Sequence, residues 1–438
     1  MRGDAGRMTG RMLARSGRVL LRGALGLVAL LAATAGAGND PSPYPPGYRL
    51  EPTSLPDPAG RYPVGTRSFE LARADGTPLG VVAWYPAAKR AGALAPYFTE
   101  AERQVTAPAM ARTFGWPPTM LQGFAGLTTH AHLDAPVAGA RFPLLVFSHG
   151  FMMYPRQNSA LMERLAAAGY IVLSVAHPGD AADLPSSRGT LAARYAETAP
   201  EPDPKAIEAF WTAPDREAQR KLLPVLWRSP RVTGMTDRLV QWRDDLRIVT
   251  DAVAGPRPPA PLRPIAAAVQ RGKLAYVGMS FGGSASVSAC VRDARCTAAI
   301  NLDGIEFDSS LYDRDAGKPV LLIQSDWKTY PNAGPPGLAF TSYDHAYERW
   351  GTAGRNPDIH RYWLKGIRHL GMSDLILAAR NPPRDALLGT IDGARATEAI
   401  NALSLAFLDQ YVGGRGGSVA GTAARHPELV RHSAGEQP

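Results

Sequence analysis

Continuous apolar runs alternate with helical segments beyond the first third of the chain, and this alternation restricts the folds open to it. The run Pro143–Ser148 is followed by a helical segment at Asn158–Ala168, which Gly169 ends, and by a second apolar run at Tyr170–Val175. Apolar runs without polar alternation are typical of strands buried on both faces of a parallel sheet. The sequence therefore predicts a βαβ unit and an α/β fold with a mostly parallel central sheet flanked by helices.

The alternation continues toward the C-terminus, and an antiparallel hairpin is predicted upstream of it. The hairpin joins Ser68–Ala72 and Leu79–Pro86 through the turn at Ala74–Thr77. The later predicted strands are Leu274–Val277, Thr297–Leu302, Pro319–Gln324 and His360–Leu364, and the predicted helices are Glu100–Thr113, Trp242–Val253, Ser284–Val291 and Ala394–Tyr411.

Composition divides the chain into segments. Of its 438 residues 45% are hydrophobic and 20% are charged, which excludes a mainly disordered protein. We predict a leader at residues 1–37, a Pro- and Gly-rich linker at 38–60 and one α/β domain at 61–412. Residues 181–235 are charged, proline-containing and weakly periodic, which favours a lid-like insertion or a surface excursion. Residues 413–438, rich in Gly, Ala and Arg, are predicted to be a flexible tail.

The leader has the three parts of an export signal. A basic region with six arginines precedes the apolar run Ala24–Leu31, and Ala35-Gly36-Ala37 fits an A-x-A cleavage site. The run is shorter than the roughly 20 residues of a membrane-spanning helix, and no nearby cysteine follows it as a lipid acceptor. We expect an exported protein, periplasmic or secreted, without a stable membrane anchor; Met8 and Met12 are alternative starts.

The leader also accounts for much of the positive charge. Residues 1–37 contribute +5 of the formal net charge of +9. The remainder has no Lys/Arg run interleaved with aromatic residues, so we expect no nucleic-acid partner.

The two cysteines of the chain, Cys290 and Cys296, are close in sequence. In the oxidising compartment that the leader implies, they can close a small loop. With no histidine nearby, they make a poor metal site. We therefore predict a disulfide.

The segment Tyr276–Gly283 reads as a strand that enters a G-x-S-x-G motif, followed by a helix. A serine on such a sharp turn is held in a strained backbone conformation, and its neighbours must be small for the turn to close. The helix N-terminus behind it favours developing negative charge. Ser280 is therefore the predicted nucleophile.

A nucleophilic serine needs a base, which in this fold follows it along the chain. His369 directly follows the strand His360–Leu364, so it should lie at the carboxyl edge of the sheet and is the predicted base. The less favoured candidates are His345 in a helical stretch, His360 within a strand, and His426 and His432 in the tail.

Two aspartates compete to orient that base. Asp303 follows the first strand after the nucleophile, and Asp326 follows the next strand. Both should lie at the same edge of the sheet, so the strand order alone leaves the choice open. The other aspartate would cap a helix or stabilise a loop.

An oxyanion hole needs two backbone N–H groups. We assign one to Phe281, directly after the nucleophile, and the other to Phe151, in the loop after an early strand. His149 and His177 precede the serine, and we expect both to brace loops rather than act as bases.

A set of sequence blocks occurs in order between residues 61 and 375. The blocks are Arg61–Gly65, Ala83–Pro86, Val146–Gly150, Leu165–Val172, Gly278–Gly283, Asn301–Gly304, and Lys365-Gly366 with His369. Together they resemble the platelet-activating factor acetylhydrolase family of α/β-hydrolases, and the Ala, Arg and Gly bias suggests a bacterial-type exported member. The resemblance implies an α/β-hydrolase fold, Asp303 as the acid with Asp326 as the fallback, and activity without a metal or other cofactor.

These inferences predict an exported serine esterase or lipase that acts through an acyl-enzyme on a small-molecule ester or a short-acyl lipid. Bacterial members of the group are often general esterases, so phospholipid specificity does not follow. The alternatives are a dienelactone-hydrolase-like or polyester-cleaving enzyme with the same residues, and a non-catalytic binding module on the same fold.

Overall fold

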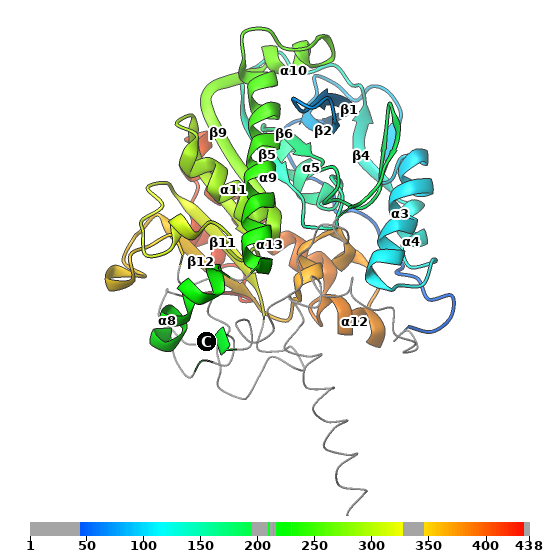
Figure 1. Cartoon of the computed structure of the whole chain (residues 1–438). Helices are drawn as coiled ribbons and strands as arrows, with labels where there is room; N and C mark the ends of the chain where they lie inside the picture. The colour runs from blue at the N-terminus through cyan, green and yellow to red at the C-terminus, as the bar shows by residue number, and fades with distance from the viewer. Residues whose placement is uncertain are drawn as a thin grey trace, which may run out of the picture.

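The structure is a computed structural model that describes residues 44–194, 209–210, 213, 216–228, 230–326 and 346–432 (Figure 1). Its strands form one sheet of eleven in the order β13-β12-β11-β10-β9-β5-β6-β2-β1-β4-β3, beside a separate β7–β8 hairpin. The bounds are β1 Val64–Ala72, β2 Pro78–Pro86, β3 Leu94–Pro96, β4 Thr128–Leu133, β5 Phe142–Ser148, β6 Ile171–Val175, β7 Leu184–Ser186, β8 Gly189–Leu191, β9 Val269–Met279, β10 Cys296–Leu302, β11 Val320–Ser325, β12 Ile359–Leu364 and β13 Leu429–Arg431.

The centre of the sheet is parallel, as the apolar runs predict. Strands β12, β11, β10, β9, β5 and β6 are consecutive neighbours, and each adjacent pair is parallel. The upstream hairpin is confirmed, because β1 and β2 pair antiparallel from Val64–Pro86 to Ala72–Pro78. Since parallel strands meet at one edge with their carboxyl ends, the residues after β5, β9, β10, β11 and β12 are brought together there.

Helices cover both faces of the sheet. Alternate residues of β5 explain this, since successive side chains of a strand point to opposite faces. Leu145 and Phe147 pack into one core with α5 (Ser159–Ala167) and α13 (Gly393–Leu408). Leu144 and Val146 pack into a second core with α9 (Pro230–Ala254) and α11 (Phe281–Arg292), which lie side by side in Figure 1.

The remaining helical elements are shorter or peripheral. They are α3 Glu100–Phe114, α4 Gln122–Ala125, α8 Arg216–Trp227, α10 Arg263–Ala267, α12 Pro382–Leu388 and α14 Val419–Ala423, the 3₁₀ turns Ala260–Leu262, Ser309–Leu311, Trp350–Thr352, His369–Met372 and Asp374–Leu377, and a π-helical turn at Asp409–Gly413. No helix in these described ranges combines the length and apolar character needed to cross a bilayer.

The C-terminal segment corrects the prediction of a flexible tail at 413–438. β13 pairs antiparallel with β12, placing Leu429 opposite Leu364. Val419 and Ala423 of α14 pack into the core beside α13. β13 has only three residues, which is too short to show a periodic pattern in the sequence. Its formation therefore depends on pairing with β12. Residues 433–438 lie outside the described part.

The predicted linker also packs where it is described. Leu50 and Leu55 are buried in the main core, and Pro52 forms a β-bridge with Ala378. Its proline content marks an extended segment, and that segment lies against the domain instead of standing clear of it. The leader at 1–37 and residues 38–43 lie outside the described residues.

The region 181–235 is described in pieces. It contains the β7–β8 hairpin, α8 and the beginning of α9, which starts well before the helix predicted at Trp242–Val253. Its lid-like character stays a prediction. Farther along, Cys290 near the end of α11 and Cys296 at the start of β10 form a disulfide with an S–S distance of 2.07 Å, as predicted.

Candidate active site

Ser280 lies at the junction between β9 and α11, at the carboxyl edge of the sheet. Its φ of 56° and ψ of −127° lie in a region that non-glycine residues rarely adopt. The glycines around it allow the turn: a Cβ on Gly278 would lie 2.1 Å from the Gly282 oxygen, and one on Gly282 would lie 2.2 Å from the Ser148 oxygen. Strain of this kind holds the partly exposed Ser280 hydroxyl out of the helix.

His369 reaches Ser280 from the loop after β12. Its Nε2 lies 2.9 Å from Ser280 Oγ, which is hydrogen-bonding distance. Of the alternative bases, His360 has another partner: its Nε2 is 2.8 Å from Tyr411 Oη, and burial lowers its pKa to about 4. His345 lies outside the described residues. The structure thus brings the predicted base and nucleophile together.

The carboxylate beside His369 belongs to Asp303. Its Oδ2 lies 2.6 Å from His369 Nδ1. Ser325, at the end of β11, donates from its backbone N–H to Asp303 Oδ1 at 2.8 Å and from its hydroxyl to Oδ2 at 2.6 Å. Asp326 is used differently, because its Oδ2 accepts the backbone N–H of Gly366 at 2.8 Å. It therefore supports the loop that carries His369.

The two segments expected to form an oxyanion hole meet beside Ser280. Phe281 is the first residue of α11, and its ring lies edge to face with that of Phe151 at 5.9 Å. A Cβ placed on Gly150 would lie only 3.4 Å from Ser280 Cβ. The loop after β5 therefore lies directly beside the serine.

The two upstream histidines are buried in the structure. His149 Nδ1 lies 2.7 Å from the Gly150 oxygen, and His149 Nε2 accepts the backbone N–H of His177 at 3.2 Å. Burial, followed by the neighbouring His177, holds the pKa of His149 well below its usual value. A neutral, enclosed imidazole suits the bracing role predicted from its position.

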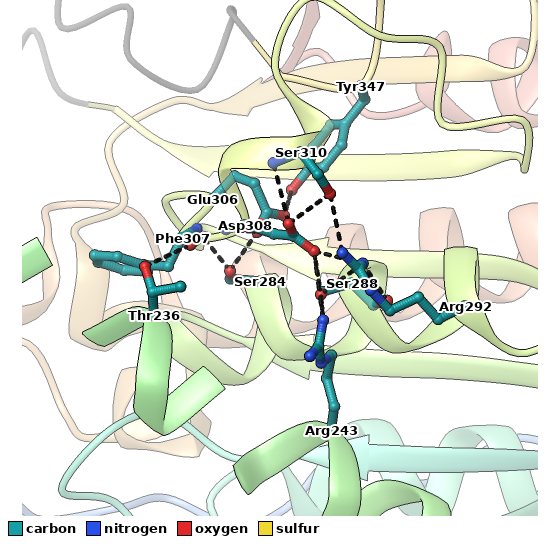
Figure 2. Close-up of polar contacts among 10 residues, drawn as sticks. All are labelled: Thr236, Arg243, Ser284, Ser288, Arg292, Glu306, Phe307, Asp308, Ser310 and Tyr347. Atoms are coloured by element: carbon teal, nitrogen blue, oxygen red, sulfur yellow. Dashed lines mark hydrogen bonds and ion pairs between the residues drawn. The ribbon is translucent and has the colours of Figure 1, made fainter. Parts of the chain in front are cut away.

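The loop that follows Asp303 in the sequence carries a carboxylate network that sequence reasoning missed (Figure 2). Glu306 is buried, and its Oε1 accepts the hydroxyl of Ser284 on α11 at 2.8 Å while its Oε2 is 2.8 Å from Tyr347 Oη. Burial raises the pKa of Glu306 to about 8, against hydrogen bonds that lower it. Asp308 accepts the hydroxyl of Ser288 at 2.6 Å. The network therefore attaches the loop after Asp303 to α11, the helix that follows Ser280.

The only sequence signal for this network is the pair of acids that follows Asp303 in the same loop, Glu306 and Asp308. Acidic loop residues are mostly solvated, so this spacing alone does not indicate burial. Within the described ranges, no group of three or more His, Cys, Asp or Glu side chains is arranged to hold a metal ion.

Residues 50–213 match the family described as "Platelet-activating factor acetylhydrolase, isoform II", a match that ends before Ser280. The platelet-activating factor acetylhydrolase of Canis lupus familiaris is 24% identical over 307 residues, covering 66% of this chain and 62% of the dog protein. Over part of its length, the chain is similar to platelet-activating factor acetylhydrolases. The match to the dog protein thus spans less than two thirds of that relative's length.

A fungal relative and a solved structure extend the comparison. The "Probable 1-alkyl-2-acetylglycerophosphocholine esterase" of Arthroderma benhamiae is 23% identical, covering 70% of this chain and 69% of its own. The structure of a ferulic acid esterase from Streptomyces cinnamoneus superposes with a TM-score of 0.61 at 23% identity, covering 86% of this chain and 98% of the other. With the parallel sheet and flanking helices, this likeness confirms the α/β-hydrolase fold.

Proposed function

We propose that the chain is a serine carboxylic-ester hydrolase that works through an acyl-enzyme. The observation that carries this proposal is the continuous hydrogen-bonded series from Ser280 through His369 to Asp303, with the serine strained and partly exposed. The relatives named as acetylhydrolases and esterases support the same reaction class. A binding module would need none of this geometry.

The first chemical step is the activation of Ser280. As its oxygen attacks the ester carbonyl, His369 Nε2 takes the hydroxyl proton, and Asp303 accepts the Nδ1–H and stabilises the imidazolium. Ser325, with two donors on Asp303, keeps that carboxylate in the orientation the imidazole requires. The acid is thus fixed before substrate arrives, which lowers the reorganisation needed during the reaction.

The negative charge then develops on the former carbonyl oxygen. We assign its stabilisation to the backbone N–H groups of Phe281 and Phe151, supported by the N-terminal end of α11. When the tetrahedral intermediate collapses, His369 returns the proton to the leaving alcohol and the acyl group stays on Ser280. Water, deprotonated by the same histidine, then releases the acid and regenerates the serine.

The substrate class we propose is a small ester or a lipid with a short acyl group. The fungal relative's name specifies a 2-acetyl ester, which favours short acyl groups. A dienelactone-type or polyester-cleaving activity would use the same residues and is separated from this proposal by substrate range alone. We also propose export through the leader at 1–37, with which the Cys290–Cys296 disulfide is compatible.

The test is the initial rate on p-nitrophenyl esters from acetate to palmitate, measured for the wild type and Ser280→Ala. Ser286→Ala is the matched control, because this buried serine lies on the same helix and its hydroxyl has no hydrogen-bond partner among the described residues. We expect turnover of short esters that Ser280→Ala abolishes and Ser286→Ala retains. Activity extending to palmitate would point to a lipase-type pocket, and the absence of serine-dependent turnover would overturn the proposal.

A further inference from the structure

A second Ser–His–Asp series lies entirely inside the domain, behind the loop that follows β5. Ser148 Oγ lies 2.9 Å from His177 Nε2, and His177 Nδ1 lies 2.9 Å from Asp245 Oδ2. Arg73 completes the series with two hydrogen bonds to Asp245, at 2.8 and 2.7 Å. The exposed fraction of Ser148, His177 and Asp245 is 0%. Such a buried array cannot attack a substrate, so its function must be found in what it contacts.

The proton positions in this series follow from burial and charge. Burial lowers the pKa of His177 despite the neighbouring carboxylate, so the imidazole is neutral near pH 7. Burial alone would raise the pKa of Asp245, but the hydrogen bonds from His177 and Arg73 outweigh it and lower that pKa. Asp245 is therefore ionised and accepts the Nδ1–H of His177. The free Nε2 lone pair then accepts the Ser148 hydroxyl, so both ring nitrogens of His177 have a defined hydrogen-bond partner.

The series is attached to the backbone that we assign to the oxyanion hole. Ser148 directly precedes His149, whose Nε2 accepts the backbone N–H of His177. Beyond Phe151, the backbone N–H of Met152 donates to the Asp180 oxygen at 2.8 Å. The oxyanion loop is thus bonded on both sides of Phe151 to the segment after β6.

One face of α9 holds that segment from the other side. Arg238, Trp242 and Asp245 are spaced i, i+4 and i+7, so they project from the same side of the helix. Trp242 stacks on His177 with ring centroids 3.7 Å apart and donates from Nε1 to Asp180 Oδ2 at 2.9 Å. Arg238 forms an ion pair with Asp180, and its guanidinium lies over the Phe151 ring.

We propose that His177, held between Ser148 and Asp245, is a positioning residue that keeps the Phe151 N–H directed at the developing oxyanion. This inference rests on the proposed function. Backbone donors stabilise an oxyanion only when they are fixed at the place where its charge develops. A loosened loop therefore reduces the stabilisation of the transition state more than it reduces the affinity for the ester. The expected signature of losing the array is a lower kcat with a nearly unchanged KM.

The experiment compares Asp245→Asn with Thr250→Val. Asparagine has the same shape as aspartate, but its neutral amide has only one acceptor oxygen. It therefore cannot accept the His177 Nδ1–H together with both Arg73 hydrogen bonds. Thr250 is a matched control because it is buried on the same helix and bonds to Tyr276 Oη at 3.0 Å, away from the oxyanion loop. Ser148→Ala is a milder second variant that removes one oxygen from the array. It serves as the test if Asp245→Asn does not fold.

Three readouts are collected below the unfolding transition. The first is kcat and KM on a p-nitrophenyl ester that the wild type hydrolyses. The second is the inhibition constant of an alkyl trifluoromethyl ketone. The Ser280 oxygen adds to the carbonyl carbon of this inhibitor, the serine proton passes to His369, and the carbonyl π electrons move to the oxygen to form the oxyanion. The third is hydrogen exchange of the peptide that spans residues 148–153, which needs no activity.

For Asp245→Asn we expect kcat to fall about 10- to 100-fold, with KM changed less than about threefold. The inhibition constant of the ketone should rise in proportion to the loss of kcat/KM, and exchange at 148–153 should accelerate. Ser148→Ala should give smaller changes in the same direction, and Thr250→Val should give none of them.

Two results would overturn the inference. If Asp245→Asn and Ser148→Ala lower only the melting temperature, the array is part of the core and does not position the donor. If KM rises while kcat and exchange stay at wild-type values, the array shapes the substrate pocket instead. A wild type without Ser280-dependent turnover would overturn the proposed function itself, and the exchange data would still report separately whether the array holds the loop.

Discussion

The molecule contains two Ser–His–Asp series with nearly the same hydrogen-bond geometry. In both, the histidine Nε2 lies 2.9 Å from the serine oxygen, and the distances from Nδ1 to the carboxylate are 2.6 and 2.9 Å. Both also begin where a parallel strand of the sheet ends. The members are Ser280, His369 and Asp303 in the first series and Ser148, His177 and Asp245 in the second.

Their surroundings differ in every respect that matters for chemistry. Ser280 is partly exposed, has a φ of 56° and begins a helix. Ser148 is the last residue of a buried strand, and the ring of Trp242 covers its histidine. A hydrogen-bonded series is therefore insufficient to define a nucleophile. Access, backbone strain and a helix N-terminus distinguish a reacting serine from a supporting one.

The strongest test of this comparison removes the serine oxygen from each series in turn. Ser280→Ala removes the atom that we propose attacks the ester, so we expect kcat on a short p-nitrophenyl ester to fall at least about 10⁴-fold. Ser148→Ala removes only a supporting hydrogen bond, and we expect a loss below about tenfold. Steady-state rates of the two purified variants check this. Equal losses would mean that exposure and strain do not separate the two series.

The next effect concerns the two aspartates that the strand order left open. Asp303→Asn offers His369 an amide in place of the carboxylate that holds its tautomer, and kcat should fall about 10³- to 10⁴-fold. Asp326→Asn weakens one bond to the Gly366 backbone, and kcat should fall less than about tenfold. The comparison is made at saturating substrate over pH 6 to 9. A larger loss for Asp326→Asn would reassign the acid.

A third prediction concerns Glu306, the buried carboxylate in the loop that follows Asp303. Glu306 has an ordinary pKa of 4.5 and a pKa of about 8 in the folded chain. Between these values the folded state holds a proton that the unfolded state has released, so the free energy of unfolding falls as pH rises. The slope contributed by Glu306 is at most about 1.4 kcal/mol per pH unit.

Glu306→Gln removes this titration while an amide can still bond to Ser284 and Tyr347. Urea unfolding at several pH values should therefore show the wild type losing stability relative to Glu306→Gln from about pH 5 to pH 8. The difference should then stay constant at higher pH. A difference independent of pH throughout would show that Glu306 is already ionised in the folded protein.

The smallest expected effect is at the far end of the nucleophile helix. Replacing Cys290 and Cys296 together by serine opens a short loop, and we expect a loss of about 2 kcal/mol in the free energy of unfolding. The disulfide lies one helix length from Ser280, so kcat measured well below the melting temperature should stay within about twofold of wild type. A large loss of kcat would show that opening the disulfide at one end of α11 changes the conformation of Ser280 at the other end.

Local sequence was sufficient for the central part of this fold. Buried strands produce apolar runs, from which the parallel sheet could be predicted. The glycine-flanked turn after one strand predicted the position of Ser280, and the end of another strand predicted the position of His369. These features depend on residues close together in the chain. The resemblance to relatives then favoured Asp303, which periodicity could not separate from Asp326.

Tertiary structure decided the features that depend on distant partners. The C-terminal strand β13 exists because β12 offers an unpaired edge, and the burial of Glu306 depends on α11 and Tyr347 from elsewhere in the chain. His177 likewise acquires its partner from α9, 68 residues later. The energy of such contacts comes from burial and pairing across the fold, which leave no local period in the sequence.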